Sequence, residues 1–412
     1  MYFAERKEIS MKSIRDIYKI GKGPSSSHTM GPAKAMSIYV GEHPEADSYK
    51  VVLFGSLADT GVGHGTDKAI DSATEKKVEI ILNTTDRNLP HENTMDIYSI
   101  VGGEAVSKMR VMSIGGGDIK IEGREGEGVN QVYPESTFTE ISKYCKGEGI
   151  RLSDYVFLRE GKEIKEFLST VWETMQNAII EGLNASGILP GGLEVERKAQ
   201  YLYNQRHINE SEVTRENRIV CSYAYAVSEQ NADNGTIVTA PTCGACAVLP
   251  SVLKYMQQKH RFSDDEIIRA LAVAGLIGAL TKTNASVSGA ECGCQAEIGT
   301  ACSMASAALG ELFEMDIDQI EYAAEIAFEH HLGLTCDPIC GLVQIPCIER
   351  NAVAAMRAIN AINLADLLSG SRKISLDLVI RTMYETGKDL SHHYRETSTG
   401  GLAKLYEVKK NG

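Results

Sequence analysis

The hydrophobic pattern of this 412-residue chain changes its period between residues 150 and 165. Before this point, short β-rich runs alternate with helix-like stretches; the runs are KVVLFG (50–55), KVEIIL (77–82) and VMSIGGGDIKIEG (111–123), and the first and third end in glycine. After it, helical patterns follow one another from EIKEFLSTVWETMQNAIIEGL (163–183) onward, and the one brief strand pattern is TIVTAP (236–241). We therefore expect an α+β domain over residues 1–155, followed by a mostly α-helical domain over residues 165–412.

The longest apolar run lies in the helical half. It reads ALAVAGLIGAL (270–280), about half of the ~20 residues that span a bilayer. Its alanines and glycines are suited to close helix packing, so we interpret it as a buried core helix. No membrane association is expected.

Charge and the N-terminal sequence indicate where such a chain works. The formal net charge is −13, and no basic stripe suited to a phosphate backbone is present, so nucleic acid is not an expected partner. The N-terminus carries charges from residue 5 onward and does not resemble a secretory signal. We expect a cytoplasmic protein, in which cysteines remain thiols instead of forming disulfides.

Cysteine is concentrated in the helical half. Nine of the ten cysteines lie between Cys221 and Cys347, and only Cys145 is outside this block. Thiolates are soft ligands for zinc, copper(I) or iron–sulfur clusters, so the block predicts a metal site. The pair Cys243 and Cys246 has the spacing of a redox C-x-x-C, but the βαβ pattern of a thioredoxin-like fold does not follow it.

Two polar motifs in the first half are candidates for catalysis. The first, GKGPSSSHTMGP (21–32), places Ser25, Ser26, Ser27, His28 and Thr29 just before a helix start at Pro32. Helix N-termini offer unpaired N–H groups and a positive dipole end, so this motif is suited to bind a carboxylate.

The second motif is GSLADTGVGHGTDKAI (55–70), which we interpret as a glycine-rich turn between a strand and a helix. It lacks the Gly-Lys-Ser/Thr of a phosphate-binding loop, so nucleotide binding is not expected. His64 stands between two glycines. We expect it to be exposed and to titrate near neutrality, as a general base would.

Taken together, these motifs are similar to those of the iron–sulfur L-serine dehydratases. The resemblance also includes LPGGL (189–193), NASVSGAECGCQAEIGTACSMA (284–305), EHHLGLTCDPICGLVQIPCIERNA (329–352) and ETSTGGLA (396–403). It implies conversion of L-serine to pyruvate and ammonia by a 4Fe-4S cluster, without pyridoxal phosphate. It also implies that Cys294, Cys336 and Cys347 hold this cluster and leave one iron open to take the serine hydroxyl.

The resemblance implies roles for other residues too. Ser25, Ser26, Ser27 and Thr29 would anchor the serine carboxylate, and His28 and His64 would be the catalytic base or the proton donor, in an order that the sequence does not assign. Lys282 and Asn284 would complete the substrate pocket, unless they are only polar groups at a helix end. The resemblance further implies an oxygen-sensitive enzyme and a homodimer.

Several alternatives stay open from the sequence. The same site could act on L-cysteine or L-threonine. If Cys292, Cys302 or Cys340 were a fourth cluster ligand, a sensor or electron-transfer protein would be favoured over an enzyme. A structural zinc site and a pyridoxal-phosphate lyase are further alternatives; the latter lacks the expected lysine motif and the two doubly wound domains.

Overall fold

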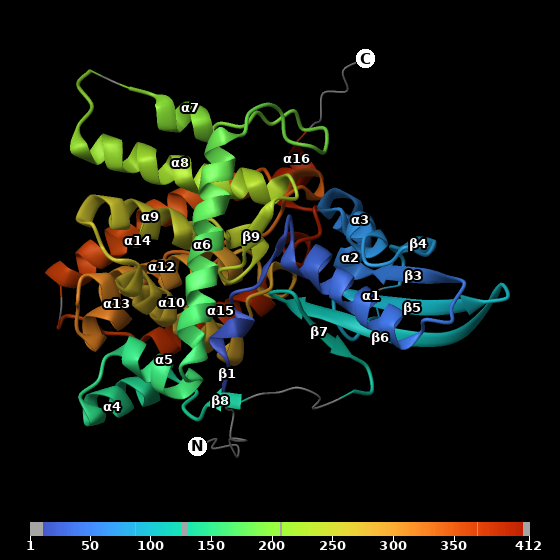
Figure 1. The fold of residues 1–412 in the computed structure, drawn as a ribbon, viewed down its shortest axis with the longest axis horizontal. Helices are drawn as coiled ribbons and strands as arrows, with labels where there is room; N and C mark the ends of the chain where they lie inside the picture. Colours follow the sequence, from blue (N-terminus) through green and yellow to red (C-terminus); the bar gives the residue numbers. More distant parts are fainter. Residues whose placement is uncertain (1–10, 87, 125–130, 207, 369, 407–412) are drawn as a thin grey trace.

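The computed structural model describes residues 11–406 apart from residues 87, 125–130, 207 and 369. The first ten residues, on which the expectation of no secretory signal largely depends, lie outside this range. Figure 1 shows a sheet with three helices (blue to cyan) beside a helical region (green to red). The predicted fold class is therefore confirmed. The predicted division between residues 155 and 165 stays a prediction.

A five-stranded mixed sheet forms the N-terminal region. Its strand order is β4-β3-β5-β6-β7, with β3 and β4 parallel and the other neighbours antiparallel. The strands are β3 (Ser48–Phe54), β4 (Val78–Asn83), β5 (Thr94–Val101), β6 (Glu104–Gly115) and β7 (Asp118–Ile121). All three predicted β-rich runs lie in this sheet, and the third supplies the end of β6 and all of β7. Strand β5 was not among the predicted strands.

Three helices cover one face of the sheet. They are α1 (Gly31–Glu42), α2 (Gly55–His64) and α3 (Thr66–Asp71). Side chains that alternate along β3, namely Tyr49, Val51 and Leu53, are buried against helix residues such as Met36 and Leu57. The prediction of a turn over residues 55–64 is wrong: this segment is helix α2, because Leu57 and its neighbours pack into the core of the sheet.

The remaining chain is largely helical. Its α-helices are α4 (Phe138–Glu148), α5 (Leu152–Glu160), α6 (Glu163–Asn184), α7 (Ala199–Asn204), α8 (Glu212–Ala232), α9 (Val248–His260), α10 (Asp264–Asn284), α11 (Gly289–Cys292), α12 (Thr300–Leu312), α13 (Ile317–Glu329), α14 (Cys347–Leu367), α15 (Leu376–Asp389) and α16 (Gly401–Leu405). Short helical turns are η1 (Ile14–Asp16), η2 (Ser26–Met30), η3 (Cys243–Ala245), η4 (Gln295–Gly299), η5 (Ile339–Gly341) and η6 (His392–Tyr394).

Helix α10 lies at the centre of the helical region. Residues 270–280 within it are buried, which confirms the predicted core helix. Small residues allow the close approach: a Cβ on Gly275 would lie 2.9 Å from the Tyr18 ring. Among the described residues, no helix combines the length and the apolar character needed to cross a membrane.

The first described residues join the two regions. Strand β1 (Met11–Lys12) pairs with β8 (Gln131–Tyr133), and β2 (Ile20–Lys22) pairs with β9 (Thr236–Val238), both antiparallel. Ile14, Ile17 and Tyr18 between them belong to the core of the helical region, although they precede the sheet in sequence. The serine-rich loop that follows β2 is thereby held at the junction of the two regions.

The contact between α6 and α8 provides a test of this packing. A Cβ on Gly182 would lie 2.2 Å from the Ala226 carbonyl oxygen, so Gly182→Ala is expected to destabilise the protein by about 1–3 kcal/mol. The control is Gly147→Ala in α4, where a Cβ meets nothing within 4 Å and the change should be neutral or stabilising by about 0.5–1 kcal/mol. Thermal unfolding of both variants measures the difference; equal midpoints would contradict the packing.

Candidate active site

Two histidines from separate motifs stack at the junction of the two regions. His28 lies on η2 and His64 ends α2, and their ring centroids are 4.3 Å apart with the planes inclined by 26°. Both side chains are fully buried. The predicted exposure of His64 is therefore wrong. His64 is buried because the helical region packs directly against this end of α2: a Cβ on the neighbouring Gly63 would lie only 2.5 Å from the Cys340 carbonyl oxygen.

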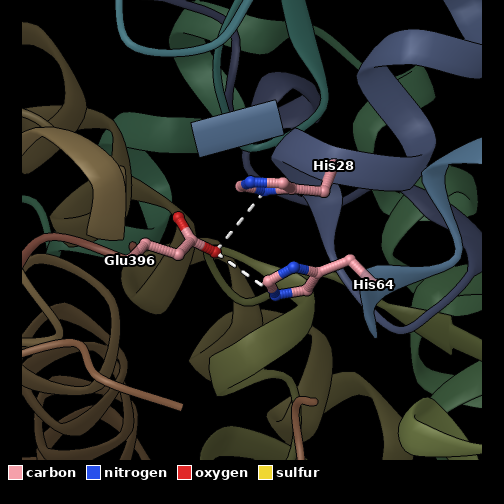
Figure 2. A group of neighbouring side chains, drawn as sticks. All are labelled: His28, His64 and Glu396. Carbon is pink, nitrogen blue, oxygen red and sulfur yellow. Dashed lines mark ion pairs between the residues drawn. The ribbon is translucent and has the colours of Figure 1, made fainter. Parts of the chain in front are cut away.

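The carboxyl group of Glu396 completes this cluster (Figure 2). Its Oε1 lies 3.5 Å from His28 Nδ1 and 3.7 Å from His64 Nε2. We refer to His28, His64 and Glu396 as the two-histidine cluster. The sequence interpretation did not single out Glu396, although it begins the ETSTGGLA motif that contributed to the resemblance.

Hydrogen bonds on the far side of each ring fix which nitrogen carries the proton. His64 Nδ1 lies 3.1 Å from the Thr60 carbonyl oxygen, which can only accept, so Nδ1 carries the proton. His28 Nε2 lies 3.0 Å from the Ser56 hydroxyl, and that hydroxyl donates its own proton to the Glu396 carbonyl oxygen at 2.7 Å. His28 Nε2 therefore also carries the proton. Both lone-pair nitrogens then face Glu396 Oε1.

Burial determines the charges in the two-histidine cluster. It lowers the pKa of His64 to about 4, and it lowers the pKa of His28 with a smaller contribution from the neighbouring His64. Burial, with the nearby Cys294 thiol, raises the pKa of Glu396 to about 8. Both imidazoles are therefore neutral at neutral pH and can accept a proton.

The serine-rich loop lies against His28. The hydroxyls of Ser25 and Ser27 are 3.3 and 3.2 Å from His28 Nδ1, and Ser25 Oγ also accepts from the His28 backbone N–H. Ser26 and Thr29 are buried in the same turn, where the Thr29 hydroxyl donates to the Ser25 carbonyl. The structure thus brings both predicted motifs of the first half into one place.

The thiols of Cys294, Cys336 and Cys347 form a second group nearby, which we call the three-thiol group. A hydrogen bond between Cys294 and Cys336 lowers the pKa of Cys294 to about 6 and raises that of Cys336. Burial and the neighbouring Cys294 raise the pKa of Cys347. The guanidinium of Arg350 interacts electrostatically with all three sulfurs. Three soft donors beside a cation are suited to an anionic metal–thiolate centre.

The other cysteines considered as ligands lie elsewhere. Cys292 is directed toward α15, where a Cβ on Gly387 would be 2.8 Å from its sulfur. The Cys302 thiol donates to the Ala354 carbonyl at 3.2 Å, and Cys340 is exposed. None of the described contacts of these residues reaches the three-thiol group. The donor set therefore fits a 4Fe-4S cluster with three protein ligands.

Main-chain hydrogen bonds tie the two groups together. The Cys336 N–H donates to the Tyr394 carbonyl, and the Glu396 N–H donates to the Cys336 carbonyl, both at 2.8 Å. Glu297 also lies here: its Oε2 is 4.0 Å from the Cys336 sulfur, and its Oε1 accepts from the Thr242 hydroxyl at 2.7 Å. The three-thiol group and the two-histidine cluster are thus neighbours in one buried site.

Lys282 and Asn284 are engaged in other contacts. Lys282 forms an ion pair with Asp118 and donates to the Asp16 carbonyl at 3.2 Å. Asn284 is exposed and donates to the carbonyls of Ser136 and Leu280 at 2.7 and 2.9 Å. These described contacts do not include the histidines or the three thiols. Their role in substrate binding stays a prediction.

Two protein families and several relatives match this chain. The family described as Serine dehydratase beta chain matches residues 13–75, and the family described as Serine dehydratase alpha chain matches residues 63–403. L-serine dehydratase 1 of Escherichia coli is 42% identical over 95% of this chain and 99% of its own. The L-serine dehydratases of Haemophilus influenzae and Streptomyces coelicolor are 41% and 39% identical, with 95% of this chain aligned to 99% and 98% of theirs.

The matches to the two families together extend from the serine-rich loop to the ETSTGGLA motif. They therefore include every residue of the two-histidine cluster and the three-thiol group. The chain belongs to the L-serine dehydratase family of lyases, with its beta-chain and alpha-chain regions in a single polypeptide.

Proposed function

We propose that this chain converts L-serine to pyruvate and ammonia. The relatives named above are L-serine dehydratases, and the observation that carries the proposal is the placement of two neutral histidines beside three thiols in one buried site. Elimination from serine requires a base for the α-proton and help for a poor leaving group, the hydroxyl. The two groups of side chains are suited to these two tasks.

The three-thiol group would hold the 4Fe-4S cluster. When bound, the cluster supplies a Lewis acid that assists departure of the serine hydroxyl. Arg350 would balance the negative charge of the thiolates, and the burial of Cys294 and Cys336, with Cys347 half-buried, would limit the access of solvent to the site.

The serine-rich loop would bind the substrate carboxylate. It offers the hydroxyls of Ser25 and Ser27 and the start of a helix, where backbone N–H groups have no intrahelical partner. Ser26 and Thr29 would shape the turn, since the Thr29 hydroxyl is already bonded to the Ser25 carbonyl. A carboxylate held here would place the α-carbon of serine near His28 and His64.

His64 would be the base that removes the α-proton. Its Nε2 carries a lone pair, is buried, and has no hydrogen-bond partner among the described residues, whereas His28 Nδ1 is already within reach of two serine hydroxyls. The Thr60 carbonyl would hold the imidazolium that forms. Loss of the α-proton and the hydroxyl yields 2-aminoacrylate and one water. 2-Aminoacrylate tautomerises to 2-iminopropionate, whose hydrolysis consumes one water and releases pyruvate and ammonia.

A comparison of substrates tests this proposal. Anaerobic protein carrying its cluster is given L-serine, L-threonine or L-cysteine, and pyruvate, 2-oxobutyrate and sulfide are measured. We expect L-serine to be used with the highest kcat/KM. Sulfide release from L-cysteine that exceeds pyruvate formation from L-serine would make the proposed substrate wrong. The cytoplasmic location and the homodimer remain part of the proposal.

A further inference from the structure

We propose that the two-histidine cluster also binds one divalent cation of the zinc type, through His28 Nδ1, His64 Nε2 and Glu396 Oε1. These ligand atoms lie within 4.8 Å of one another. In tetrahedral zinc sites, metal–ligand distances near 2.0–2.1 Å place the ligand atoms about 3.3–3.4 Å apart. Two of the three separations, 3.5 and 3.7 Å from Glu396 Oε1, exceed these values by a few tenths of an ångström, and the third, between His28 Nδ1 and His64 Nε2, is at most 4.8 Å.

Hydrogen bonds on the ring nitrogens that do not face Glu396 orient both histidines for metal binding. Metal-bound histidine is neutral and donates its other ring N–H to an oxygen acceptor. Thr60 supplies this acceptor for His64, and Ser56 supplies it for His28. Both rings are thereby held with their lone-pair nitrogens, His28 Nδ1 and His64 Nε2, turned toward Glu396, as Figure 2 shows.

An unpartnered polar atom gives independent support. His64 Nε2 is buried and has no hydrogen-bond partner among the described residues. Buried polar atoms without partners are rare, because leaving one unsatisfied costs about 1–3 kcal/mol. Here two acceptor nitrogens face one carboxyl group, an arrangement that a cation placed between them would satisfy.

The donor set selects the class of metal. Two imidazoles and one carboxylate suit zinc or another late first-row metal better than Mg²⁺ or Ca²⁺, which prefer oxygen ligands alone. Three protein ligands leave a fourth position for water or for a hydroxyl of the serine-rich loop. The site therefore differs from the three-thiol group in its ligand chemistry, which makes the two separable by experiment.

Bound zinc would occupy the lone pair of His64 that the proposed reaction uses. This consequence rests on the proposed function: zinc and L-serine would exclude each other, and zinc would inhibit reversibly without displacing the iron–sulfur cluster. The binding of zinc itself does not depend on that function.

The test uses anaerobic protein with its cluster in place, dialysed against buffered Zn²⁺. We expect roughly one zinc ion per chain, and zinc-edge X-ray absorption should show nitrogen and oxygen neighbours at about 2.0–2.1 Å. Iron content should be unchanged. Sulfur neighbours at about 2.3 Å from the zinc would overturn the inference, as would protein that retains no zinc. Both outcomes are measured on the wild-type protein.

Variants assign the ligands. His64→Gln and Glu396→Gln should lower zinc affinity at least about 100-fold, whereas His331→Gln, a buried histidine of the α13 C-terminus outside the cluster, should retain the wild-type affinity. Equal zinc binding by all three would overturn the proposal. Wild-type protein with saturating L-serine should release its zinc. If zinc instead stays bound through nitrogen and oxygen, the proposed metal site is supported and the proposed position of the substrate is contradicted.

Discussion

Replacing Cys336 with alanine is expected to remove both the iron–sulfur cluster and the formation of pyruvate. Cys336 shares a hydrogen bond with Cys294, and its main chain is bonded to Glu396, so it connects the three-thiol group to the two-histidine cluster. Loss of one of three ligands leaves a cluster without stable attachment. Iron and sulfide content, visible absorbance and pyruvate formation after anaerobic reconstitution measure the effect.

The matched controls are two other buried cysteines. Cys302 lies in the same helical region with its thiol bonded to the Ala354 carbonyl, and Cys145 lies in α4. Cys302→Ala and Cys145→Ala should retain iron and activity, with at most a modest loss of thermal stability. Full iron content and turnover in Cys336→Ala would show that the three-thiol group does not hold the cluster. Loss of the cluster in a folded Cys302→Ala protein would contradict the restriction of the ligands to the three-thiol group.

Replacing His64 with glutamine is expected to lower kcat by about 10²–10⁴-fold while the iron content stays that of the wild type. His64 Nε2 is the free lone pair of the two-histidine cluster, and glutamine retains polarity but cannot act as a base at neutral pH. Steady-state kinetics with L-serine, together with iron analysis of the same preparation, measure both quantities.

His331→Gln is the control for this substitution as well. His331 is buried and bonded to the Ala327 carbonyl, so its replacement tests what loss of a buried histidine does to folding alone. Its kcat should stay within about twofold of the wild type. If His64→Gln kept the wild-type kcat, the base would have to be another group, and His28 would be the first to examine.

The sequence predicts strands β3 and β4, the end of β6 with β7, and helices α6 and α10, because their hydrophobic periods are clear. The α2 segment reads as a turn in the sequence because its three glycines outweigh a weak apolar pattern, although Leu57 and Ala58 pack into the sheet core. The incorrect prediction that His64 is exposed followed from that error. Flanking glycines indicated space around the ring, but the η5 turn of the distant helical region fills it.

Glu396 illustrates what one sequence cannot provide. A lone glutamate more than 300 residues from either histidine carries no local signal, and it is brought to them by its main-chain hydrogen bonds to Cys336 and to the Ser56 hydroxyl. Lys282 lies close in sequence to a predicted cluster ligand, and the fold pairs it with Asp118, so its predicted role in substrate binding stays a prediction. Proximity in sequence and proximity in the site are separate properties.

The most direct test of the account is anaerobic reconstitution with iron and sulfide, followed by a pyruvate assay with L-serine. We predict that pyruvate formation rises in proportion to the iron–sulfur cluster bound, and that protein without the cluster forms none. A fully loaded protein that forms no pyruvate, or iron-free protein that forms it at the same rate, would contradict the claim that the three-thiol group and the two-histidine cluster together make a serine dehydratase.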